Sequence, residues 1–462
     1  MAHRFTFYFP TRTLVLVFGE VILIVCSFVL ATILQFGGRY YTVLSYENGL
    51  VKIGVVSFLG MLCMYYLDLY DPQRLHTPGE MPFRLLVVVG TLSLILGLVT
   101  TLVPSFLVGN YVFLTGLPIL TVLVLGWRRI FFAINGNDRF VQRTLILGDG
   151  DYADLLNEEI MKRPQLGLKI VGFLHAGPRD AHSQSLRELG TVDELEDVVA
   201  KQAVRRIVVS MKDRRGKLPV DTLLSLKTEG VVIEEAADFY ESISGRVPLD
   251  SLRVSWLLFT RGFCPSKIQL FATRTAYTII AAIMLVLGIP ILALTALAIL
   301  IDTGRPVLFR QKRVGRNGKI FTLYKFRSMR VQDSQSGKGK PAQDGDTRFT
   351  WTGRFLRKAR LDELPQLYNI LRGDMSFVGP RPFMVEEEFD WAKQIPFYER
   401  RWSVRPGATG WAQIHRPYCA TLEDNQEKLS YDLFYIKNMS IGLDFLILFQ
   451  TVKTLLLRRG SR

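Results

Sequence analysis

RKARLDELPQLYNILRGDMSFVGPRP, residues 357–382, is the stretch around which the chain is best understood, because it sets two adjacent acids among arginines. Asp362 and Glu363 follow a basic run and precede a short predicted helix. The apolar residues of that helix recur at helical spacing: Leu364, Leu367, Tyr368 and Leu371. Gly373 should end the helix, and the prolines of residues 379–382 should fix a tight turn that aims Arg381.

The acid pair has two interpretations. In the first, a carboxylate acts as a nucleophile on a phosphoryl group, and arginines neutralise the phosphate oxygens. Mg²⁺ would then bridge the carboxylates and a diphosphate. In the second, Asp362 caps the helix and Glu363 stands in its first turn, where acids suit the helix dipole. The two are compatible, because the start of a helix is also a favourable place for a phosphate.

Charge and composition narrow the class of protein. The 462 residues are 49% hydrophobic and carry a formal net charge of +15. Residues 302–360 hold 16 Lys and Arg against 4 Asp and Glu. Because apolar segments flank this block, we interpret it as a surface for phosphates or anionic lipid rather than nucleic acid. The four cysteines lack metal-ligand spacing, and no cleavable signal peptide is expected, because the first apolar run is too long.

Residues 1–136 contain four apolar segments long enough to cross a bilayer: 14–36, 50–67, 84–108 and 111–134. Arginines cluster before the first segment and after the fourth, so we predict a four-helix transmembrane bundle with both ends in the cytoplasm. Glu20 lies in the first segment and needs a partner or a place near the interface. Buried core helices of a soluble protein are the alternative, which four such runs in succession disfavour.

Residues 137–262 alternate short apolar strands with helical stretches, which predicts a Rossmann-like domain built on a parallel sheet. Strands are expected near 143–148, 169–176, 205–211 and 230–236. Gly148, Gly150 and Ala153 form a turn of the kind that binds a dinucleotide phosphate, but Asp149 and Asp151 put negative charge there. Nucleotide binding and a structural or regulatory sheet both remain open.

Residues 263–462 form the third predicted domain, which is mainly helical. Within it, residues 275–301 are uncharged, and Gly288 and Pro290 stand at the centre of the run. Basic residues flank both ends, and a fifth crossing would move Asp362 to the face opposite the sheet domain. We therefore predict a re-entrant helix-break-helix that enters and leaves on the cytoplasmic face. A kinked spanning helix is the alternative.

Further elements surround the acid pair. A hairpin is predicted between 310–314 and 319–329, because a Gly-rich turn separates them. Lys325 and Arg327 should share one face of its second strand. An amphipathic helix is expected over 386–402 and an interfacial helix over 441–457. Arg405 and Gln413 lie in the turn-rich segment between these helices.

Four blocks in this order resemble the bacterial sugar transferases, the monotopic phosphoglycosyl transferases: 310–329, 361–382, 404–413 and 431–440. Residues 411–440 are most similar to the members tied to exopolysaccharide export and exosortase systems. Ala408 and Met439 depart from the usual pattern, and neither touches the expected chemistry. The resemblance also implies a membrane helix broken near a proline, and a sheet domain ahead of the catalytic part.

The resemblance implies transfer of a sugar-1-phosphate from a UDP-sugar to polyprenyl (undecaprenyl) phosphate, with release of UMP. This reaction would begin exopolysaccharide biosynthesis. Asp362 would carry a covalent phosphosugar, Glu363 would bind metal or handle a proton, and both acids would hold Mg²⁺. The residues expected to bind substrate are Arg357, Arg381, Lys325, Arg327, Arg405 and Gln413.

The implied location is the bacterial inner membrane, with several passes and the active site on the cytoplasmic face. The expected partners are the UDP-sugar, the polyprenyl phosphate and the membrane, and the bundle and sheet domain offer surface for a homodimer. The sequence does not name the sugar. Two other functions remain: a non-catalytic membrane scaffold that senses a nucleotide through residues 143–260, and a glycosyltransferase that moves only the sugar and releases UDP.

Overall fold

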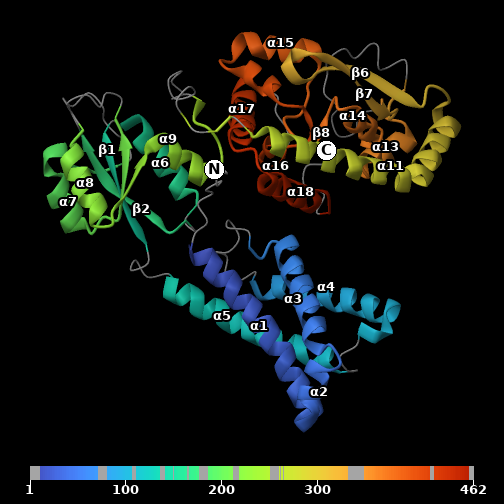
Figure 1. Cartoon of the computed structure of the whole chain (residues 1–462), viewed down its shortest axis with the longest axis horizontal. Helices are drawn as coiled ribbons and strands as arrows, with labels where there is room; N and C mark the ends of the chain where they lie inside the picture. Colours follow the sequence, from blue (N-terminus) through green and yellow to red (C-terminus); the bar gives the residue numbers. More distant parts are fainter. Residues whose placement is uncertain are drawn as a thin grey trace. The chain divides into compact units, whose positions relative to one another are not determined.

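The computed structural model describes residues 11–70, 81–106, 111–135, 141–148, 150–163, 166–175, 186–211, 218–249, 260, 262–263, 265–330, 348–416 and 421–456. These residues form two compact units, one within residues 7–244 and the other within residues 245–462. The first unit holds apolar helices and a parallel sheet, and the second is mainly helical (Figure 1).

The N-terminal apolar helices match the predicted segments. They are α1 (Thr11–Phe36), α3 (Gly49–Tyr66), α4 (Met81–Leu102) and α5 (Val112–Asn135), with a short α2 (Tyr40–Ser45) after α1. The four long helices share one apolar core, which includes Phe28, Val56, Leu92 and Val124. The predicted end of the third segment at residue 108 is wrong. Helix α4 ends at Leu102, because Pro104 lacks the N–H that a continuing helix would use.

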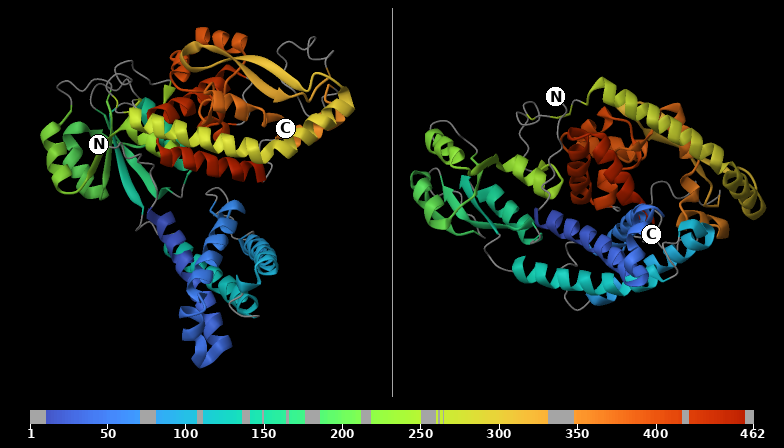
Figure 2. Two further views of the ribbon diagram at one scale, coloured as in Figure 1. Left: turned by 45° about the vertical axis from the view of Figure 1, so that its right-hand side comes forward. Right: turned by 60° about the horizontal axis from the view of Figure 1, so that its bottom comes forward.

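Helices α1 and α5 lie side by side in both views (Figures 1 and 2). Two glycines permit this close packing. A Cβ on Gly19 would come within 2.5 Å of the Trp127 ring, and one on Gly116 would come equally close to the Phe28 ring. Small residues at helix contacts let backbones approach in this way.

Glu20 is fully buried on α1, and it has the partner that such a position demands. The Arg128 guanidinium on α5 pairs with its carboxylate, and the Tyr70 hydroxyl donates to the other carboxylate oxygen. Arg128 also donates to the Leu69 carbonyl at 3.1 Å. The network therefore ties α5 to α1 and to the end of the α3 segment.

The sheet is fully parallel, with the strand order β3-β2-β1-β4-β5. Its strands are β1 (Gln142–Gly148), β2 (Leu168–His175), β3 (Glu188–Thr191), β4 (Arg206–Ser210) and β5 (Val232–Glu235). The four predicted strands are confirmed. Strand β3 was not predicted, because four residues that include Gly190 carry little apolar signal.

Helices cover both faces of this sheet, as in a doubly wound fold (Figure 1). Helices α6 (Gly150–Met161) and α9 (Ala236–Ser244) cover one face, and α7 (Leu195–Gln202) and α8 (Val220–Thr228) cover the other. Side chains of β1 alternate accordingly: Ile146 packs with α6 and α9, while Leu145 and Leu147 pack with α7 and α8.

The C-terminal unit is built along one long helix, α11 (Lys267–Thr303). The Ser266 side chain caps its start by accepting from the Gln269 amide, and Gly304, at φ +69°, follows its last residue. The predicted interruption near Gly288 and Pro290 is wrong in one respect. The helix stays continuous through Pro290 and bends along its length (Figure 2).

The predicted hairpin is confirmed. Strands β6 (Leu308–Val314) and β7 (Ile320–Phe326) pair antiparallel, and Val314 opposite Ile320 closes the ladder. Asn317 and Gly318 both have positive φ, which such turns require. The hairpin packs against α11 through Leu323 and Phe326.

The remaining elements follow in short pieces. They are α13 (Trp351–Lys358), the 3₁₀ turn η8 (Leu361–Glu363), α14 (Gln366–Arg372), β8 (Ser376–Val378), α15 (Val385–Gln394), η9 (Tyr398–Ser403), β9 (Gly407–Thr409), α16 (Trp411–His415), α17 (Leu422–Lys437) and α18 (Ile441–Leu456). The single predicted helix over 386–402 is wrong. Helix α15 ends at Gln394 before Pro396, and Phe397 turns the chain with a φ of +63°.

Strands β8 and β9 run parallel and bring the turn that carries Arg381 against the turn that carries Arg405. Glycine is required where the two backbones meet. A Cβ on Gly379 would lie 2.4 Å from the Arg405 carbonyl, and one on Gly407 would lie 2.2 Å from the Gly379 nitrogen. No side chain fits at these contacts.

Candidate active site

Local packing fixes the strand and the turn that carry the predicted site residues. Asn369 on α14 is fully buried, with an exposed fraction of 0%. Its Nδ2 donates to the Thr322 carbonyl at 2.7 Å, and its Oδ1 accepts from the Tyr324 amide at 3.1 Å. These two bonds lock β7 to α14, so Lys325 on β7 is held beside the η8 turn that carries Glu363.

Glu363 is the meeting point of three cations. Its Oε1 atom lies 3.1 Å from Lys325 Nζ, 3.2 Å from an Arg381 Nη2 atom and 3.7 Å from Arg360 Nη1. Burial acts to raise the pKa of Glu363, but Lys325, Arg381 and Arg360 outweigh burial and hold this pKa well below its usual range. Glu363 is therefore a fixed anion at the centre of a cationic cluster.

Asp362, the neighbouring residue, has a different environment. It is only 8% exposed, and its Oδ1 atom has no hydrogen-bond partner among the residues that the structure describes. Burial and the Glu363 carboxylate raise the pKa of Asp362, while Lys325 and nearby arginines act against them. The two adjacent carboxyls thus have pKa values pushed in opposite directions, which is how acids in one site come to take different roles.

The helix-capping interpretation of Asp362 is wrong. Helix α14 begins after Pro365, which forms no side-chain cap, and Arg360 stands at the cap position of η8 with a φ of +56°.

Gly373 ends α14 with a φ of +86°, as predicted. Tyr368, expected to share an apolar helix face with Leu364, Leu367 and Leu371, is instead exposed and meets the Tyr324 ring edge to face.

Arg357 lies near Asp362, since its charge acts to lower the Asp362 pKa. Its guanidinium stacks over the Phe349 ring, 4.3 Å from the centroid. Arg405 has other neighbours: burial and the charges of Arg274 and Arg316 lower its pKa. Arg405, which lies in the turn before β9, therefore has two further arginines from distant parts of the chain near it, and such a group favours an anion.

Arg327 and Gln413 are placed differently from Lys325. Strand β7 ends at Phe326, and the Arg327 side chain donates to Thr303 Oγ1 and, at 2.7 Å, to the Gly304 carbonyl, both at the end of α11. Its Nε and Nη1 atoms are buried and have no hydrogen-bond partner among the described residues. Gln413 lies on α16, and its buried Nε2 atom likewise lacks a partner in the described part of the chain. Neither residue contacts Glu363 in the described structure.

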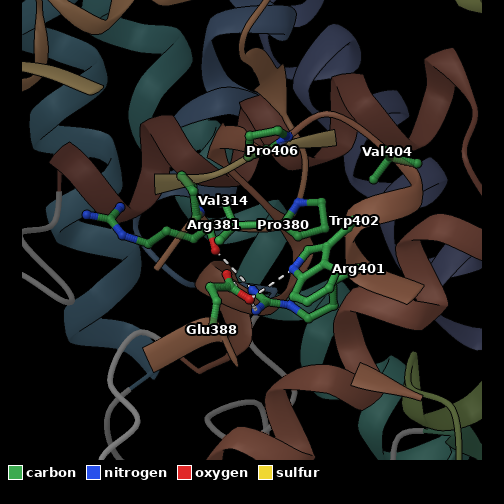
Figure 3. Close-up of a pocket in the computed structure, with 10 residues that line it drawn as sticks. Val314, Pro380, Arg381, Glu388, Arg401, Trp402, Val404 and Pro406 are labelled. Carbon is green, nitrogen blue, oxygen red and sulfur yellow. Dashed lines mark hydrogen bonds and ion pairs between the residues drawn. The ribbon is translucent and has the colours of Figure 1, made fainter. Parts of the chain in front are cut away.

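Sequence reasoning did not place two arginines in this site. Arg360 stands in the basic run, and only its left-handed backbone brings it back toward Glu363. Arg401 is buried beneath the turn that carries Arg381, in a small pocket lined by Pro380, Glu388 and Trp402 (Figure 3). The adjacent Arg400 is exposed, and no local pattern separates the two arginines.

The acid pair supplies the one or two carboxylates that a magnesium ion commonly uses in a protein. No group of three or more His, Cys, Asp and Glu residues gathers within the described ranges. Mg²⁺ commonly uses one or two carboxylates and takes its other ligands from substrate phosphates and water. The unpartnered Asp362 oxygen suits such a cation, with Glu363 beside it. The pair therefore fits Mg²⁺ held jointly with a phosphorylated substrate.

The glycine turn of the sheet domain has a clear structural role at its first residue. Gly148 has a φ of +123°, and a Cβ there would lie 2.7 Å from the Met211 nitrogen. Gly148 therefore lets the ends of β1 and β4 approach. Asp149 and the Asp151 side chain lie outside the described residues, so the nucleotide-binding interpretation stays a prediction.

Two family models match the chain. One, described as bacterial sugar transferase, matches residues 268–458, and one described as a CoA-binding domain matches residues 66–231. The first range contains the acid pair and its cations. The second covers much of the parallel sheet.

Several curated proteins are similar to this chain. A UDP-N-acetylgalactosamine-undecaprenyl-phosphate N-acetylgalactosaminephosphotransferase of Aeromonas hydrophila is 43% identical over 48% of this chain and 52% of its own length. A UDP-glucose:undecaprenyl-phosphate glucose-1-phosphate transferase of Xanthomonas campestris is 31% identical over 67% of this chain and 66% of its own length. A UDP-glucose:undecaprenyl-phosphate glucose-1-phosphate transferase of Caulobacter vibrioides is 41% identical over 40% of this chain and 69% of its own length. The chain thus spans between half and about two thirds of these relatives.

Proposed function

The chain belongs to the bacterial sugar transferase family, and from that premise we propose that it transfers a sugar-1-phosphate from a UDP-sugar to undecaprenyl phosphate. UMP would be released, and the product would be a polyprenyl diphosphate sugar. The reaction would begin the synthesis of an exopolysaccharide. The names of the relatives support the substrate class, and they include two donors, UDP-glucose and UDP-N-acetylgalactosamine.

One observation carries the proposal. Asp362 offers a buried carboxylate oxygen without a hydrogen-bond partner among the described residues, beside a Glu363 that is already held by three cations. A carboxylate oxygen that no donor ties up keeps its lone pairs for attack on phosphorus. The surrounding cations supply the positive charge that phosphoryl transfer requires.

In the first proposed step, an Asp362 carboxylate oxygen attacks the β-phosphorus of the UDP-sugar. The bond from that phosphorus to the bridging oxygen breaks, and UMP leaves with the bridging oxygen. The sugar phosphate is then covalently attached to Asp362. Arg357 and Arg381 would bind the phosphate oxygens, since guanidinium forks suit that geometry.

In the second step, an oxygen of the lipid phosphate attacks the same phosphorus. The bond to Asp362 breaks, and the carboxylate is restored. Lys325 and Arg381 hold Glu363 as an anion, so Glu363 orients these two cations toward the phosphates. Asp362 and Glu363 would also hold Mg²⁺, which when bound would neutralise charge on the diphosphate.

We propose that the site lies at the cytoplasmic face of the bacterial inner membrane. Among the residues that the structure describes, five helices are long and apolar enough to cross a membrane: the α1 region, α3, α4, α5 and α11. At 37 residues, α11 is about 55 Å long by its rise per residue, well over the ~30 Å hydrocarbon core of a bilayer.

Contacts at both ends of α11 argue against a fifth crossing. Near its start, the Gln269 side chain donates to the Met439 carbonyl at 2.9 Å. At its end, Asp302 accepts from the Thr352 amide at 3.1 Å, and Arg327 binds the last residues. Both ends therefore bind one compact unit, as expected for a helix that enters and leaves on one face.

The exposed side of this unit supports the same placement. Helix α13 presents Trp351, 80% exposed, and Phe355, 62% exposed, together with Arg354 and Lys358. These four residues share one face of the helix, which sets aromatic side chains that favour a membrane interface beside cations that attract anionic headgroups. Helix α18 also exposes apolar residues, among them Phe445.

The decisive test identifies the nucleotide released by the purified full chain. The assay would contain Mg²⁺, undecaprenyl phosphate in nanodiscs and, separately, UDP-glucose, UDP-N-acetylgalactosamine and other UDP-sugars. Release of UMP is expected with at least one donor. UDP would instead indicate a glycosyltransferase, and release of neither would favour a nucleotide-sensing scaffold.

Topology has its own test. In a chain freed of natural cysteines, Glu47→Cys lies between α2 and α3 and should react with a membrane-impermeant thiol reagent added to intact cells. Lys319→Cys, in the exposed turn of the β6–β7 hairpin, should react only after the membrane is opened. Labelling of Lys319→Cys in intact cells would show that α11 spans the membrane.

A further inference from the structure

A cluster of buried charges lies beneath the turn that carries Arg381. Arg401 donates from Nε to Asp432 Oδ2 at 2.8 Å and from Nη1 to both Glu388 oxygens at 3.2 Å. The side chains of these three residues are all no more than 3% exposed. The Tyr398 hydroxyl accepts a further hydrogen bond from Arg401 at 2.6 Å. Every acidic group of the cluster is thus ion-paired with one guanidinium.

The third nitrogen of the Arg401 guanidinium, Nη2, links this cluster to the active-site turn. Arg401 Nη2 donates to the Arg381 carbonyl at 2.9 Å, and Glu388 Oε1 accepts from the Phe383 amide at 3.1 Å. Figure 3 shows the Arg381 carbonyl directed toward Arg401, while the Arg381 guanidinium extends the other way. That guanidinium lies 3.2 Å from Glu363. One residue therefore joins the buried cluster to the proposed catalytic site.

The turn itself has little freedom once these bonds are made. Pro380 and Pro382 restrict φ on both sides of Arg381. Gly407 donates to the Pro380 carbonyl at 2.9 Å, and Arg313 donates to the Pro382 carbonyl at 3.2 Å. Arg401 fixes the Arg381 carbonyl as well. The direction in which the Arg381 side chain leaves the backbone is therefore set.

We propose that Arg401 is a positioning residue for Arg381, and that Glu388 and Asp432 serve to orient it. The proposal rests on the proposed function, in which Arg381 binds a substrate phosphate. Buried ion pairs of this kind are weak stabilisers, because apolar residues of similar volume often pack as well. Apolar packing has no donor for the Arg381 carbonyl, so the charged cluster supplies orientation that a hydrophobic core would not.

A double-mutant cycle in activity tests the proposal. Arg401→Lys keeps the charge but loses the planar fork, so we expect kcat/KM for UMP release to fall at least about tenfold. In an Arg381→Ala background, the same change should cost less than about twofold, because the side chain it positions is already gone. The exposed neighbour Arg400→Lys is the matched control and should leave kcat/KM unchanged in both backgrounds. Equal losses from Arg401→Lys in the two backgrounds would overturn the proposal.

Hydrogen–deuterium exchange gives a readout that needs no activity. Arg401→Lys should speed exchange in peptides covering residues 380–385, where Phe383 donates to Glu388, and Arg400→Lys should not. Unchanged exchange there would also overturn the proposal. If Arg401→Lys fails to fold, Glu388→Gln replaces it, because an amide still accepts from Arg401 but loses the ion pair. A wild-type chain that releases no UMP would count against the proposed function alone, since the exchange result stands by itself.

Discussion

Lys325 on strand β7 and Glu363 in the turn η8 are joined by a 3.1 Å hydrogen bond, although 38 residues separate them in sequence. The bond sets the charge state of the site. Burial lowers the pKa of Lys325, and Glu363 acts against that shift, while Lys325 is the largest of the charges that depress the Glu363 pKa. Each residue therefore keeps the other ionised in a poorly solvated place.

Replacing Lys325 should change the pH dependence of turnover. In Lys325→Met, the pKa of Asp362 loses the largest of the charges that act to lower it, so Asp362 becomes protonated at a higher pH. Because the proposed nucleophile must be ionised, the acidic limb of the kcat/KM profile should then move upward by on the order of one pH unit. Profiles from pH 4 to 8 measure this shift, and Lys319→Met, an exposed residue of the same hairpin, is the control. Superimposable profiles would separate Lys325 from the ionisation of Asp362.

Asp362→Asn should abolish transfer, because an amide does not form an acyl phosphate. UMP release should fall by at least about 10³-fold, as expected for loss of a covalent nucleophile. With a UDP-sugar labelled on its β-phosphate, the wild-type chain should retain label after denaturation, and the variant should not. Substantial turnover by Asp362→Asn would rule out the covalent step.

Asn369→Ala should destabilise the C-terminal unit. The change leaves the Thr322 carbonyl and the Tyr324 amide without their side-chain partners in a buried place. Two such losses cost about 2–4 kcal/mol together. Thermal unfolding in detergent, followed by tryptophan fluorescence, measures the effect. Gln394→Ala, which removes an exposed amide from α15, should change stability by less than about 0.5 kcal/mol. Equal Tm values for the two variants would contradict a stabilising role for the two Asn369 hydrogen bonds that join β7 to α14.

The Glu20–Arg128 pair should behave as a unit. Glu20→Ala leaves a buried guanidinium without its carboxylate and should cost about 3–5 kcal/mol. The double variant Glu20→Leu with Arg128→Met removes both charges, so it should recover most of that loss. Thermal unfolding of the single and double variants in detergent provides the cycle. Additive losses would show that the two charges act independently.

Local chemistry explains which features were predictable. The hairpin follows from Asn317 and Gly318, and the end of α14 follows from Gly373, because these positions need φ values that few residues adopt. Arg327 was expected to share a strand face with Lys325, but β7 ends one residue earlier and the alternation ends with it. That difference depends on the end of α11, which no local pattern reveals.

Tertiary contacts also decide the exposure of individual side chains. The buried arc of α14 is set by contacts of Leu367 and Ile370 with β7 and α11, and it leaves Tyr368 outside. Spacing alone fits either arc, since Tyr368 follows Leu364 by one helical turn. Likewise, the acid pair was predictable from its neighbours, whereas the orientation of Arg381 depends on a cluster assembled from three distant elements.

Asp444 should make the stability of the C-terminal unit depend on pH. On α18, its carboxylate accepts from the Tyr277 and Tyr435 hydroxyls, each at 2.9 Å, and so joins α11, α17 and α18. Burial raises the pKa of Asp444 to about 6, and the tyrosine hydrogen bonds only partly oppose that shift. The folded chain therefore binds a proton that the unfolded chain has already released between about pH 4 and pH 6. Stability from this group is fully present below that window and falls as pH rises through it, by on the order of 2–3 kcal/mol.

The expected result is a difference between variants rather than a bare pH profile, because other carboxyls titrate in the same range. Asp444→Asn carries no titrating proton at this position. Its free energy of unfolding relative to wild type should therefore improve by about 2–3 kcal/mol between pH 4.5 and pH 7. Asp390→Asn, an exposed residue of α15, should show no such change. The free energy of unfolding in detergent at the two pH values measures both variants. If Asp444→Asn and wild type change in parallel, then Asp444 is ionised in the folded chain throughout this range, and the tyrosine pair holds α11 to α18 through a carboxylate at every pH tested.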